Sequence, residues 1–394
     1  MNEFVRAYQR LLEQTQETIR RTVYDEIDST ARLICIRGTR GIGKTTFLLE
    51  YAREKYGHDT QSCMYVNLNH FYFATSTLFE FASNFYQQGG KLLILDQIFK
   101  YPDWENELLR CYHEMPNLQI IFTASSVMNM ESDYPALKSL MKVYDLHGFS
   151  FREYLNFHHK LNFKAYTLEE IINDHVSISS KILEQIHPIE DFKKYIKVGY
   201  YPPYMDATLY GETLVKNLNI LLEVDMVYIR QIEPTYLHKL RKLLYLIAVQ
   251  PKAVANVTLL SNEIGTSRAT VMNYLKHLSD AQLIRMEYKE GYEYPKKPDR
   301  VYINDTNIAS AMYPYQQSPE MIRKVFLISQ LENAGYSVSH PEGTGVDFIV
   351  NGKYKLRSAD LPRRKSTTDI IHIIENMVIG KDKQIPLWLF GFLY

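Results

Sequence analysis

A glycine-rich segment near the N-terminus constrains the possible folds of this chain more than any other feature. Residues 38–45 read Gly-Thr-Arg-Gly-Ile-Gly-Lys-Thr, which satisfies the pattern G-x-x-x-x-G-K-[ST]. An apolar run at 33–37 precedes this segment, and an amphipathic helical pattern at 45–56 follows it. This order predicts the strand, loop and helix that begin a P-loop domain. A glycine-rich turn that merely joins a strand to a helix is the alternative.

The residue types in this loop suit the binding of phosphate. Gly38, Gly41 and Gly43 let the loop wrap so that backbone N–H groups face phosphate oxygens. Lys44 neutralises the β- and γ-phosphates, Thr45 offers its hydroxyl to Mg²⁺, and the start of the helix is favourable for an anion. We therefore predict a site for ATP or ADP with Mg²⁺. The predicted cofactor-binding residues are Gly38, Arg40, Gly41, Ile42, Gly43, Lys44, Thr45 and Thr46.

The segment around the loop alternates apolar runs with helical patterns. Nearly continuous apolar runs indicate strands of a parallel sheet that is covered on both faces. The expected strands are 33–37, 64–67, 92–96, 119–123 and 143–147, and the expected helices are 45–56, 75–87 and 104–115. Helical spacing over 2–24 predicts another helix at the N-terminus. The fold class is therefore α/β with a parallel P-loop NTPase sheet, followed by a mostly helical region.

A carboxylate at the end of a buried strand predicts the metal side of the site. Residues 91–96 read Lys-Leu-Leu-Ile-Leu-Asp, so four apolar residues lead to Asp96. Such an aspartate binds Mg²⁺ directly or through water, and a turn or helix-cap aspartate is the alternative. At the tip of the fourth strand, the hydroxyl of Ser125 or Ser126 serves as a γ-phosphate sensor or simply caps the next segment.

Residue 97 bears on hydrolysis. ATPases with an additional strand between the P-loop strand and the aspartate strand usually follow the aspartate with a glutamate that polarises the attacking water, but this chain has Gln97. A neutral amide holds a water but does not accept its proton, and losing a general base costs roughly 10²–10⁴-fold in rate. We therefore predict that binding survives while hydrolysis is slow or absent. Glu105 or Glu107 is an alternative base, with helix-surface solvation as the plainer role. The predicted catalytic residues are Lys44, Asp96, Gln97 and Ser126.

The composition of the chain limits its expected binding partners and its expected location in the cell. Lysine plus arginine equals aspartate plus glutamate, 45 against 45, so no overall field attracts nucleic acid or anionic membrane. The three cysteines, Cys35, Cys63 and Cys111, have no metal-ligand spacing, and two lie in apolar runs, which indicates buried free thiols. No apolar run approaches the ~18–20 residues of a membrane span. We expect a cytoplasmic protein.

Three further segments complete a resemblance to a known family. Residues 95–104 read Leu-Asp-Gln-Ile-Phe-Lys-Tyr-Pro-Asp-Trp, residues 122–126 read Phe-Thr-Ala-Ser-Ser, and residues 146–155 read Leu-His-Gly-Phe-Ser-Phe-Arg-Glu-Tyr-Leu. Together with the P-loop, they resemble the AAA-like P-loop ATPases of bacteria and archaea over nearly the whole chain. Gln97 and Phe99 depart from the family's glutamate and polar residue at these positions.

The resemblance implies a winged helix and a C-terminal domain like restriction endonucleases. The predicted domains are an N-terminal helix (1–28), a P-loop NTPase domain (29–155), a helical lid (156–245), a winged helix (246–305) and a small α+β, degenerate endonuclease-like domain (306–394). In the last of these, Asp347 matches the first metal carboxylate of the endonuclease pattern. Residues 351–357 read Asn-Gly-Lys-Tyr-Lys-Leu-Arg and supply no second acid. Because Mg²⁺ needs clustered oxygen ligands, we predict no nuclease activity.

The predicted winged helix is compatible with two roles. Residues 257–264 and 267–278 are expected to form its two helices, and 283–286 with the tyrosines around Gly291 its wing. As a reader of duplex DNA it would use base contacts and phosphate contacts. The candidate residues are Arg268, Thr270 and Asn273 in the major groove and Lys276, Lys296 and Lys297 on phosphates. Alternatively, the winged helix packs on the nucleotide domain as a lid or interaction module, and the zero net charge gives no support to DNA binding.

These features favour an ATP-binding switch with slow or absent hydrolysis. In this hypothesis, occupancy of the nucleotide site sets how the helical and winged-helix parts dock, and a protein partner or self-association follows from it. The alternative function is a DNA-binding protein whose nucleotide is mainly structural.

Overall fold

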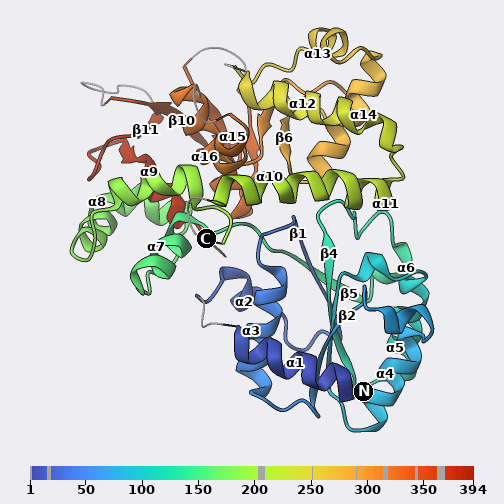
Figure 1. Ribbon diagram of the computed structural model, residues 1–394. Coiled ribbons are helices and arrows are strands. Elements are labelled where there is room, and N and C mark those ends of the chain that lie inside the picture. The colour runs from blue at the N-terminus through green and yellow to red at the C-terminus, as the bar shows by residue number, and fades with distance from the viewer. Residues whose placement is uncertain are drawn as a thin grey trace. The chain divides into compact units, whose positions relative to one another are not determined.

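The structure of the protein is a computed structural model that describes residues 2–15, 19–202, 209–250, 252–289, 291–313, 318–341, 345–361 and 369–394. The chain divides into two compact units, Met1–His147 and Gly148–Tyr394. The first unit runs from blue to cyan in Figure 1, and the second from green to red. The finer division of 148–394 that we predicted from the sequence stays a prediction.

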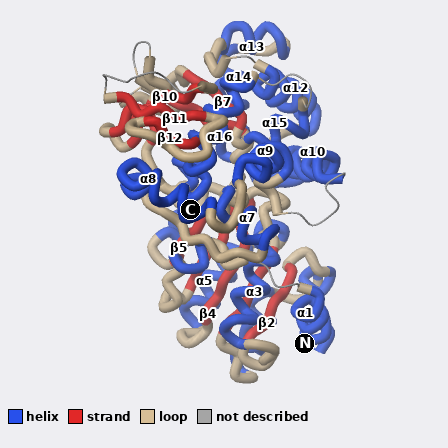
Figure 2. Tube along the Cα trace, turned by 90° about the vertical axis from the view of Figure 1, so that its left-hand side faces the viewer, coloured by secondary structure: helices blue, strands red, loops and turns tan. Residues whose placement is uncertain are grey.

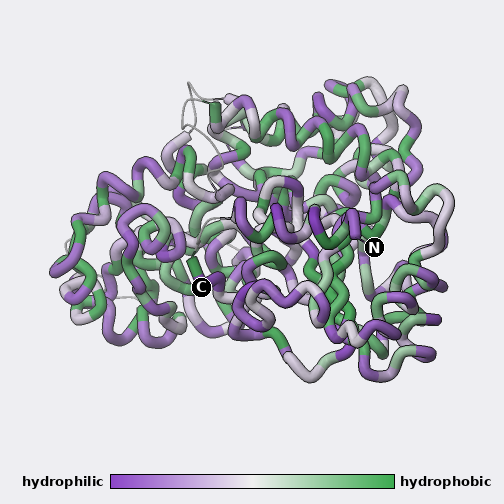
Figure 3. The backbone as a smooth tube through the Cα atoms, turned by 60° about the horizontal axis from the view of Figure 1, so that its bottom comes forward, coloured by the Kyte–Doolittle hydropathy of each residue, from purple (hydrophilic) through white to green (hydrophobic). Residues whose placement is uncertain are grey.

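A five-stranded parallel sheet forms the centre of the first unit. Its strands are β1 (Leu33–Gly38), β2 (Cys63–Asn67), β3 (Leu92–Asp96), β4 (Gln119–Ser125) and β5 (Met141–Asp145). The order is β2-β3-β4-β1-β5, so β4 lies between the P-loop strand β1 and the aspartate strand β3. Every residue of β3 is buried, as its apolar sequence predicts. Along the chain, hydrophobic stretches alternate with hydrophilic ones (Figure 3).

Helices cover both faces of this sheet (Figure 2). They are α1 (Asn2–Gln14), α2 (Thr22–Glu26), α3 (Lys44–Tyr56), α4 (Leu78–Gln87), α5 (Trp104–Glu114) and α6 (Pro135–Lys138), with short 3-10 turns η1 (Phe71–Ala74) and η2 (Ile98–Lys100). The helix α1 packs on β2 and α3 and therefore belongs to the first unit.

The single helix predicted over 2–24 is wrong in one respect. Helix α1 ends at Gln14, and α2 begins at Thr22 after an extended Arg21 with φ −77° and ψ 143°. Arg21 is buried and donates hydrogen bonds to two backbone carbonyls, so its tertiary contacts outweigh the local helical pattern. The last strand also differs, because β5 begins and ends two residues before the predicted 143–147.

The second unit begins with helices and ends with a second sheet. Its helices are α7 (Phe151–His159), α8 (Leu168–Leu183), α9 (Pro188–Val198), α10 (Tyr210–Ile220), the π-helical η4 (Leu221–Met226), α11 (Val227–Arg230), the 3-10 turn η5 (Pro234–Tyr236), α12 (Leu237–Val249), α13 (Val257–Ile264), α14 (Arg268–Asp280), α15 (Thr306–Met312), α16 (Pro319–Asn333) and the 3-10 helix η6 (Leu387–Phe392). Its strands are β6 (Ile284–Glu287), β7 (Arg300–Ile303), β8 (Val338–Ser339), β9 (Phe348–Val350), β10 (Tyr354–Ala359), β11 (Ile370–Ile374) and β12 (Gln384–Pro386).

Helices α13 and α14 lie where the helix-turn-helix was predicted. Asn256 and Ser267 cap them by accepting backbone N–H groups, and Gly265, with φ 62°, ends the first helix in a left-handed conformation. The antiparallel pair β6–β7 follows, with Glu287 opposite Arg300. The second sheet has the order β12-β11-β10-β9-β8. The sequence predicts short strands around 337–340, 347–350 and 353–356, where β8, β9 and β10 lie, but not β11 or β12.

Candidate nucleotide-binding site

The glycine-rich loop connects β1 to α3 at the carboxyl edge of the first sheet. Gly41 and Gly43 have φ values of 78° and 94°, which side-chain-bearing residues adopt with strain. A Cβ atom on Gly38 would lie 2.6 Å from the carbonyl oxygen of Leu146, so this glycine is needed for close backbone approach. The loop thus has the wrapped geometry that the motif predicts.

The start of α3 is suited to an anion. Helix α3 has 13 residues, and its N-cap Gly43 provides no side-chain cap. The first N–H groups of the helix and the helix dipole are therefore directed at the loop. The Lys44 ammonium lies at the same place and donates to the carbonyl oxygens of Gly38 (2.6 Å) and Thr39 (2.9 Å). These residues fit the phosphates of a nucleotide.

The predicted metal residues meet at the neighbouring strand ends. The Thr45 hydroxyl donates to Oδ2 of Asp96 at 2.7 Å. Asp96 is 4% exposed, and its other oxygen, Oδ1, accepts from the Thr123 hydroxyl (2.6 Å) and the Gln97 backbone N–H (2.9 Å). A hydroxyl and a carboxylate from adjacent elements are a suitable pair of oxygen groups for Mg²⁺ beside a triphosphate.

Gln97 follows Asp96 in a left-handed conformation with φ 57°. Its backbone N–H also lies 2.9 Å from the Thr123 hydroxyl, so the backbone at 97 is held in place. The side chain is half-buried, and no hydrogen bond of its amide to another described residue is found. The amide is thus available to a water. Glu107, one alternative base, instead accepts the backbone N–H of Phe79 at 2.7 Å and is engaged at the start of α4.

The predicted sensor serines adjoin the loop. Ser125 is the register partner of Gly38 in the β1–β4 pair, and the Ser126 N–H donates to the Gly38 carbonyl at 3.2 Å. Both serines are buried. The residue before the loop, Arg37, forms a two-pronged ion pair with Asp145 of β5 at 2.6 and 2.7 Å, and this contact raises the pKa of Arg37.

Two residues near the site were missed in the sequence. Tyr65 of β2 donates its hydroxyl to Asp96 Oδ2 at 2.7 Å. Arg21, which precedes α2, donates to the carbonyl of His147 at 2.5 Å and to that of Ile42 in the loop at 3.5 Å. Strand pairing explains Tyr65, because Asn67 and Asp96 are register partners at the ends of β2 and β3. No local pattern in the sequence marks Arg21.

In the second unit, four of the six predicted DNA-contacting residues lie on α14, and Lys296 and Lys297 lie between β6 and β7. Arg268 and Asn273 are exposed, whereas Thr270 and Lys276 are half-buried. Lys276 pairs with Asp280, and the Asn273 amide oxygen accepts the hydroxyl of Tyr294 at 3.0 Å. The Thr270 hydroxyl lies 2.9 Å from that of Ser267, so three of the four candidates on α14 are engaged within their own unit.

The predicted endonuclease carboxylate is also engaged. Asp347 Oδ2 accepts the backbone N–H and the hydroxyl of Ser358 at 2.8 and 2.9 Å, and Oδ1 lies 3.0 Å from the Lys324 ammonium. Lys324 also contacts Glu320 at 2.6 Å. Among the described residues, no group of three His, Cys, Asp or Glu side chains is placed to hold a metal ion.

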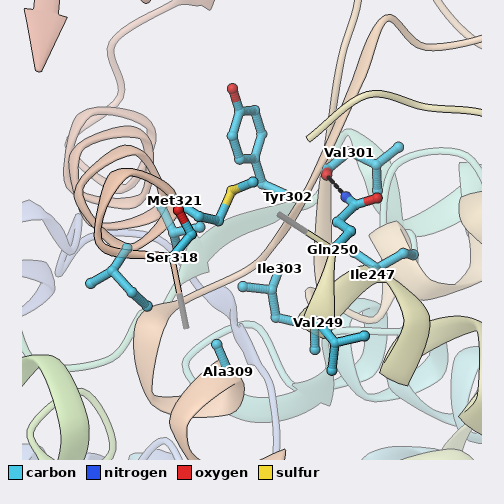
Figure 4. Close-up of a pocket in the computed structure, with 12 residues that line it drawn as sticks. Ile247, Val249, Gln250, Val301, Tyr302, Ile303, Ala309, Ser318 and Met321 are labelled. Carbon is cyan, nitrogen blue, oxygen red and sulfur yellow. Dashed lines mark hydrogen bonds between the residues drawn. The ribbon is translucent and has the colours of Figure 1, made fainter. Parts of the chain in front are cut away.

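A cavity of about 310 Å³ lies in the second unit between α12, β7 and the start of α16. Figure 4 shows the apolar side chains of Ile247, Val249 and Ile303 around it. The Gln250 amide, its main polar side chain, donates to the Val301 carbonyl at 2.8 Å (Figure 4). The lining offers few polar groups to orient a ligand.

The cysteines are buried free thiols, as predicted. Burial raises the pKa of Cys63 and of Cys111 to about 12 and raises that of Cys35 as well. Across the described part of the chain, no helix is both long and apolar enough to cross a membrane.

Two segments of the chain match known domain families. Residues 30–155 match the model of an AAA domain, and residues 189–318 match that of a domain of unknown function (DUF8612). Residues 30–155 therefore form an AAA-type P-loop domain, which supports nucleotide binding and an ATPase-like function. The match ends at residue 155, where the predicted NTPase domain also ends.

Three individual proteins resemble the chain at 25% sequence identity or less. An uncharacterized protein of Methanocaldococcus jannaschii (MJ1637) is 25% identical over 353 residues, which are 82% of this chain and 73% of that protein. The structure of C. elegans PCH-2 matches 71% of this chain with 12% identity and a TM-score of 0.25, and the chain spans 66% of it, just under two thirds. A DNA polymerase III gamma subunit-related protein of Thermotoga maritima matches 71% of this chain and 99% of its own, with 14% identity and a TM-score of 0.28. At such TM-scores, neither structural likeness bears on function.

Proposed function

We propose that this protein is a cytoplasmic ATP-binding switch in which ATP and Mg²⁺ stay bound because hydrolysis is slow. The observation that carries the proposal is the arrangement at Asp96. This buried carboxylate accepts the Thr45 hydroxyl of the P-loop helix, while the next residue is the neutral Gln97. The site thus has the groups that bind a nucleotide and lacks an acid where a general base is expected.

The chain's own groups have distinct tasks in binding. Lys44, which donates to the carbonyls of Gly38 and Thr39, would pair instead with the β- and γ-phosphates of a nucleotide, because these contacts are charge-assisted and stronger. Thr45 and Asp96 hold the metal, and Mg²⁺ when bound neutralises phosphate charge. The buried serines Ser125 and Ser126 adjoin Gly38 of the loop and would contact the γ-phosphate.

Gln97 then limits turnover. Its amide donates to or accepts from a water, but it takes up no proton at neutral pH. One predicted substitute, Glu107, is engaged with the N–H of Phe79. Hydrolysis therefore proceeds without a general base, and the occupied state persists long enough for the helical and winged-helix segments, 156–245 and 246–305, to respond to it.

The finer architecture of the second unit is part of this proposal. We assign α13, α14, β6 and β7, within 246–305, to a winged helix that acts as an interaction module. The pairing of Lys276 with Asp280 supports this role, since it neutralises a charge that DNA binding would use on phosphate. We assign α16 and β8–β12 to a degenerate endonuclease-like domain, because Lys324 and Ser358 occupy both oxygens of Asp347.

The proposal is tested by equilibrium binding of ATP with Mg²⁺ to the whole chain and to Lys44→Ala. The variant should bind at least tenfold more weakly, because one charge-assisted contact is worth about 1.5–3 kcal/mol. Lys55→Ala is the matched control, since Lys55 is an exposed cation on the same helix. Equal affinity in Lys44→Ala and Lys55→Ala would overturn the assignment of the site.

DNA binding is the second candidate, and the exposure of Arg268 and Asn273 on α14 favours it. A mobility shift on duplex DNA at low salt, weakened by salt and lost in Arg268→Glu, would support this function over the switch. No shift at low salt would exclude it.

A further inference from the structure

The carboxylate of Asp96 has a full set of hydrogen-bond donors. Oδ1 accepts from Thr123 and from the backbone of Gln97, at 2.6 and 2.9 Å. Oδ2 accepts from the hydroxyls of Thr45 and Tyr65, both at 2.7 Å. Two oxygens of an ionised carboxylate offer about four lone-pair sites. A water in the shell of Mg²⁺, or the metal itself, therefore finds no open acceptor position on Asp96.

The four donors differ in how easily each can withdraw its hydrogen bond from Asp96. The N–H of Gln97 belongs to the backbone and cannot turn away. The Thr45 hydroxyl can continue to donate to Oδ2 of Asp96 while its oxygen faces a metal. Thr123 donates to the other carboxylate oxygen, Oδ1. Tyr65 is different, because rotation about its C–O bond removes its proton from Oδ2 without moving the ring.

The surroundings of Tyr65 keep its ring in place. The ring is 7% exposed and stacks on Tyr8 of α1, with centroids 6.4 Å apart. The ring therefore stays beside Asp96 while its hydroxyl turns.

We propose that Tyr65 is a further residue of the metal site, whose hydroxyl competes with Mg²⁺ for Oδ2 of Asp96 and thereby sets the Mg²⁺ concentration at which nucleotide is bound tightly. The proposal rests on the nucleotide-binding function proposed above. A contact of Mg²⁺ with Oδ2 of Asp96 would displace the Tyr65 hydroxyl, which donates to that oxygen at 2.7 Å. Losing this donor leaves Asp96 a stronger ligand.

The test is a Mg²⁺ titration of ATP binding to the whole chain, to Tyr65→Phe and to Tyr8→Phe. Tyr65→Phe should lower the half-saturating Mg²⁺ concentration by about tenfold, the equivalent of one hydrogen bond to a charged group. ATP affinity without Mg²⁺ should stay unchanged. Tyr8→Phe removes a hydroxyl that donates to Cys63 Sγ at 3.3 Å and keeps the ring that stacks on Tyr65, so its titration should match that of the unaltered chain.

A second readout separates competition from a merely structural role. Tyr65→Phe leaves metal-free Asp96 with one donor fewer, so its Tm without ligand should fall, while the rise in Tm on adding ATP and Mg²⁺ should grow. An unchanged or raised half-saturating Mg²⁺ concentration in Tyr65→Phe would overturn the inference, because the Tyr65 hydroxyl would then have no effect on Mg²⁺ binding or would favour it. Absence of ATP binding by the unaltered chain would instead overturn the proposed function and, with it, this inference.

Discussion

Single residues at the nucleotide site are constrained from more than one side. Gly38 must pass close to Leu146 of the neighbouring segment while its carbonyl accepts from both Lys44 and Ser126. Asp96 joins three strand ends and the P-loop helix through its two oxygens. Substitutions at such positions therefore change the site through geometry as well as through chemistry.

Gly38→Ala should destabilise the first unit and weaken ATP binding. The new Cβ would lie 2.6 Å from the Leu146 carbonyl, so the backbone of the loop must shift, at a cost of about 1–3 kcal/mol. Thermal unfolding and ATP titration measure the two effects. Gly211→Ala is the control, because a Cβ there meets no atom within 4 Å and α10 tolerates alanine better than glycine. Equal behaviour of the two variants would contradict the close approach at Gly38.

A buried acid in the second unit should make stability depend on pH. Among the described residues, neither carboxylate oxygen of Glu287 has a hydrogen-bond partner. Burial raises its pKa to about 8, Glu332 adds to this, and Arg300, Lys324 and Arg285 oppose it. The folded protein therefore keeps the proton up to about pH 8, whereas the unfolded chain releases it above its ordinary value near 4.5.

Glu287→Gln should remove this dependence. Because the folded-state pKa is raised, the stability of the parent falls as pH rises from about 4.5 to about 8, by up to roughly 1.4 kcal/mol per pH unit. The free energy of unfolding of the variant, relative to that of the parent, should increase across that pH window and stay constant above it. Chemical denaturation at several pH values measures the difference, and a difference that does not change with pH would contradict the assignment.

The elements around the site are held by contacts that reach beyond local sequence. Arg21 lies between α1 and α2 and donates to His147 and to Ile42 of the loop. Its neighbour Arg20 forms ion pairs with Asp25 and Glu54 at the surface. The two arginines are adjacent in sequence but differ in burial, so they form a matched pair for testing how the loop is positioned.

Arg21→Ala should lower ATP affinity several-fold, because the loop loses a buried anchor at Ile42, and should lower Tm as two carbonyls lose a charged donor. Arg20→Ala should change affinity little and stability by less than about 1 kcal/mol, as exposed ion pairs contribute little. Isothermal titration and thermal unfolding of both variants give the comparison. A larger effect of Arg20→Ala on affinity would show that Arg21 does not position the loop.

The sequence predicts the elements of the first unit better than their tertiary contacts. Apolar runs bounded by turns locate β1, β3 and β4, and the motif locates the loop, because burial on both faces leaves a strong local signal. The helix over 2–24 is interrupted because Arg21 is used in tertiary contacts. Tyr65 joins Asp96 only through the pairing of β2 with β3, which no local pattern reveals.

In the second unit, short strands limit what the sequence predicts. Capping residues and helical spacing locate α13 and α14, whereas β12 has three residues, too few for a periodic pattern. β11 reads Ile-Ile-His-Ile-Ile, an apolar run that strand rules could have identified. Asp347 was identified by its match to the endonuclease pattern. Its partner Lys324 lies on α16, 23 residues earlier, so the local sequence does not reveal this ion pair.

At the scale of the whole molecule, the two units should unfold separately. Each is compact in its own right, and the nucleotide residues lie in the first unit. ATP with Mg²⁺ at about 100 times its Kd should therefore stabilise one of two calorimetric transitions by about 2.7 kcal/mol. Lys44→Ala should abolish that shift. An equal shift of both transitions would contradict independent unfolding.

The nucleotide site should hold ATP without turning it over quickly. Single-turnover ATP hydrolysis, measured beside equilibrium ATP binding on this chain and on Gln97→Glu, checks this expectation. We expect tight binding by both proteins, little turnover with Gln97, and turnover raised by about 10²-fold or more by the glutamate. Rapid turnover with Gln97 in place would contradict the account, because another residue would then activate the water.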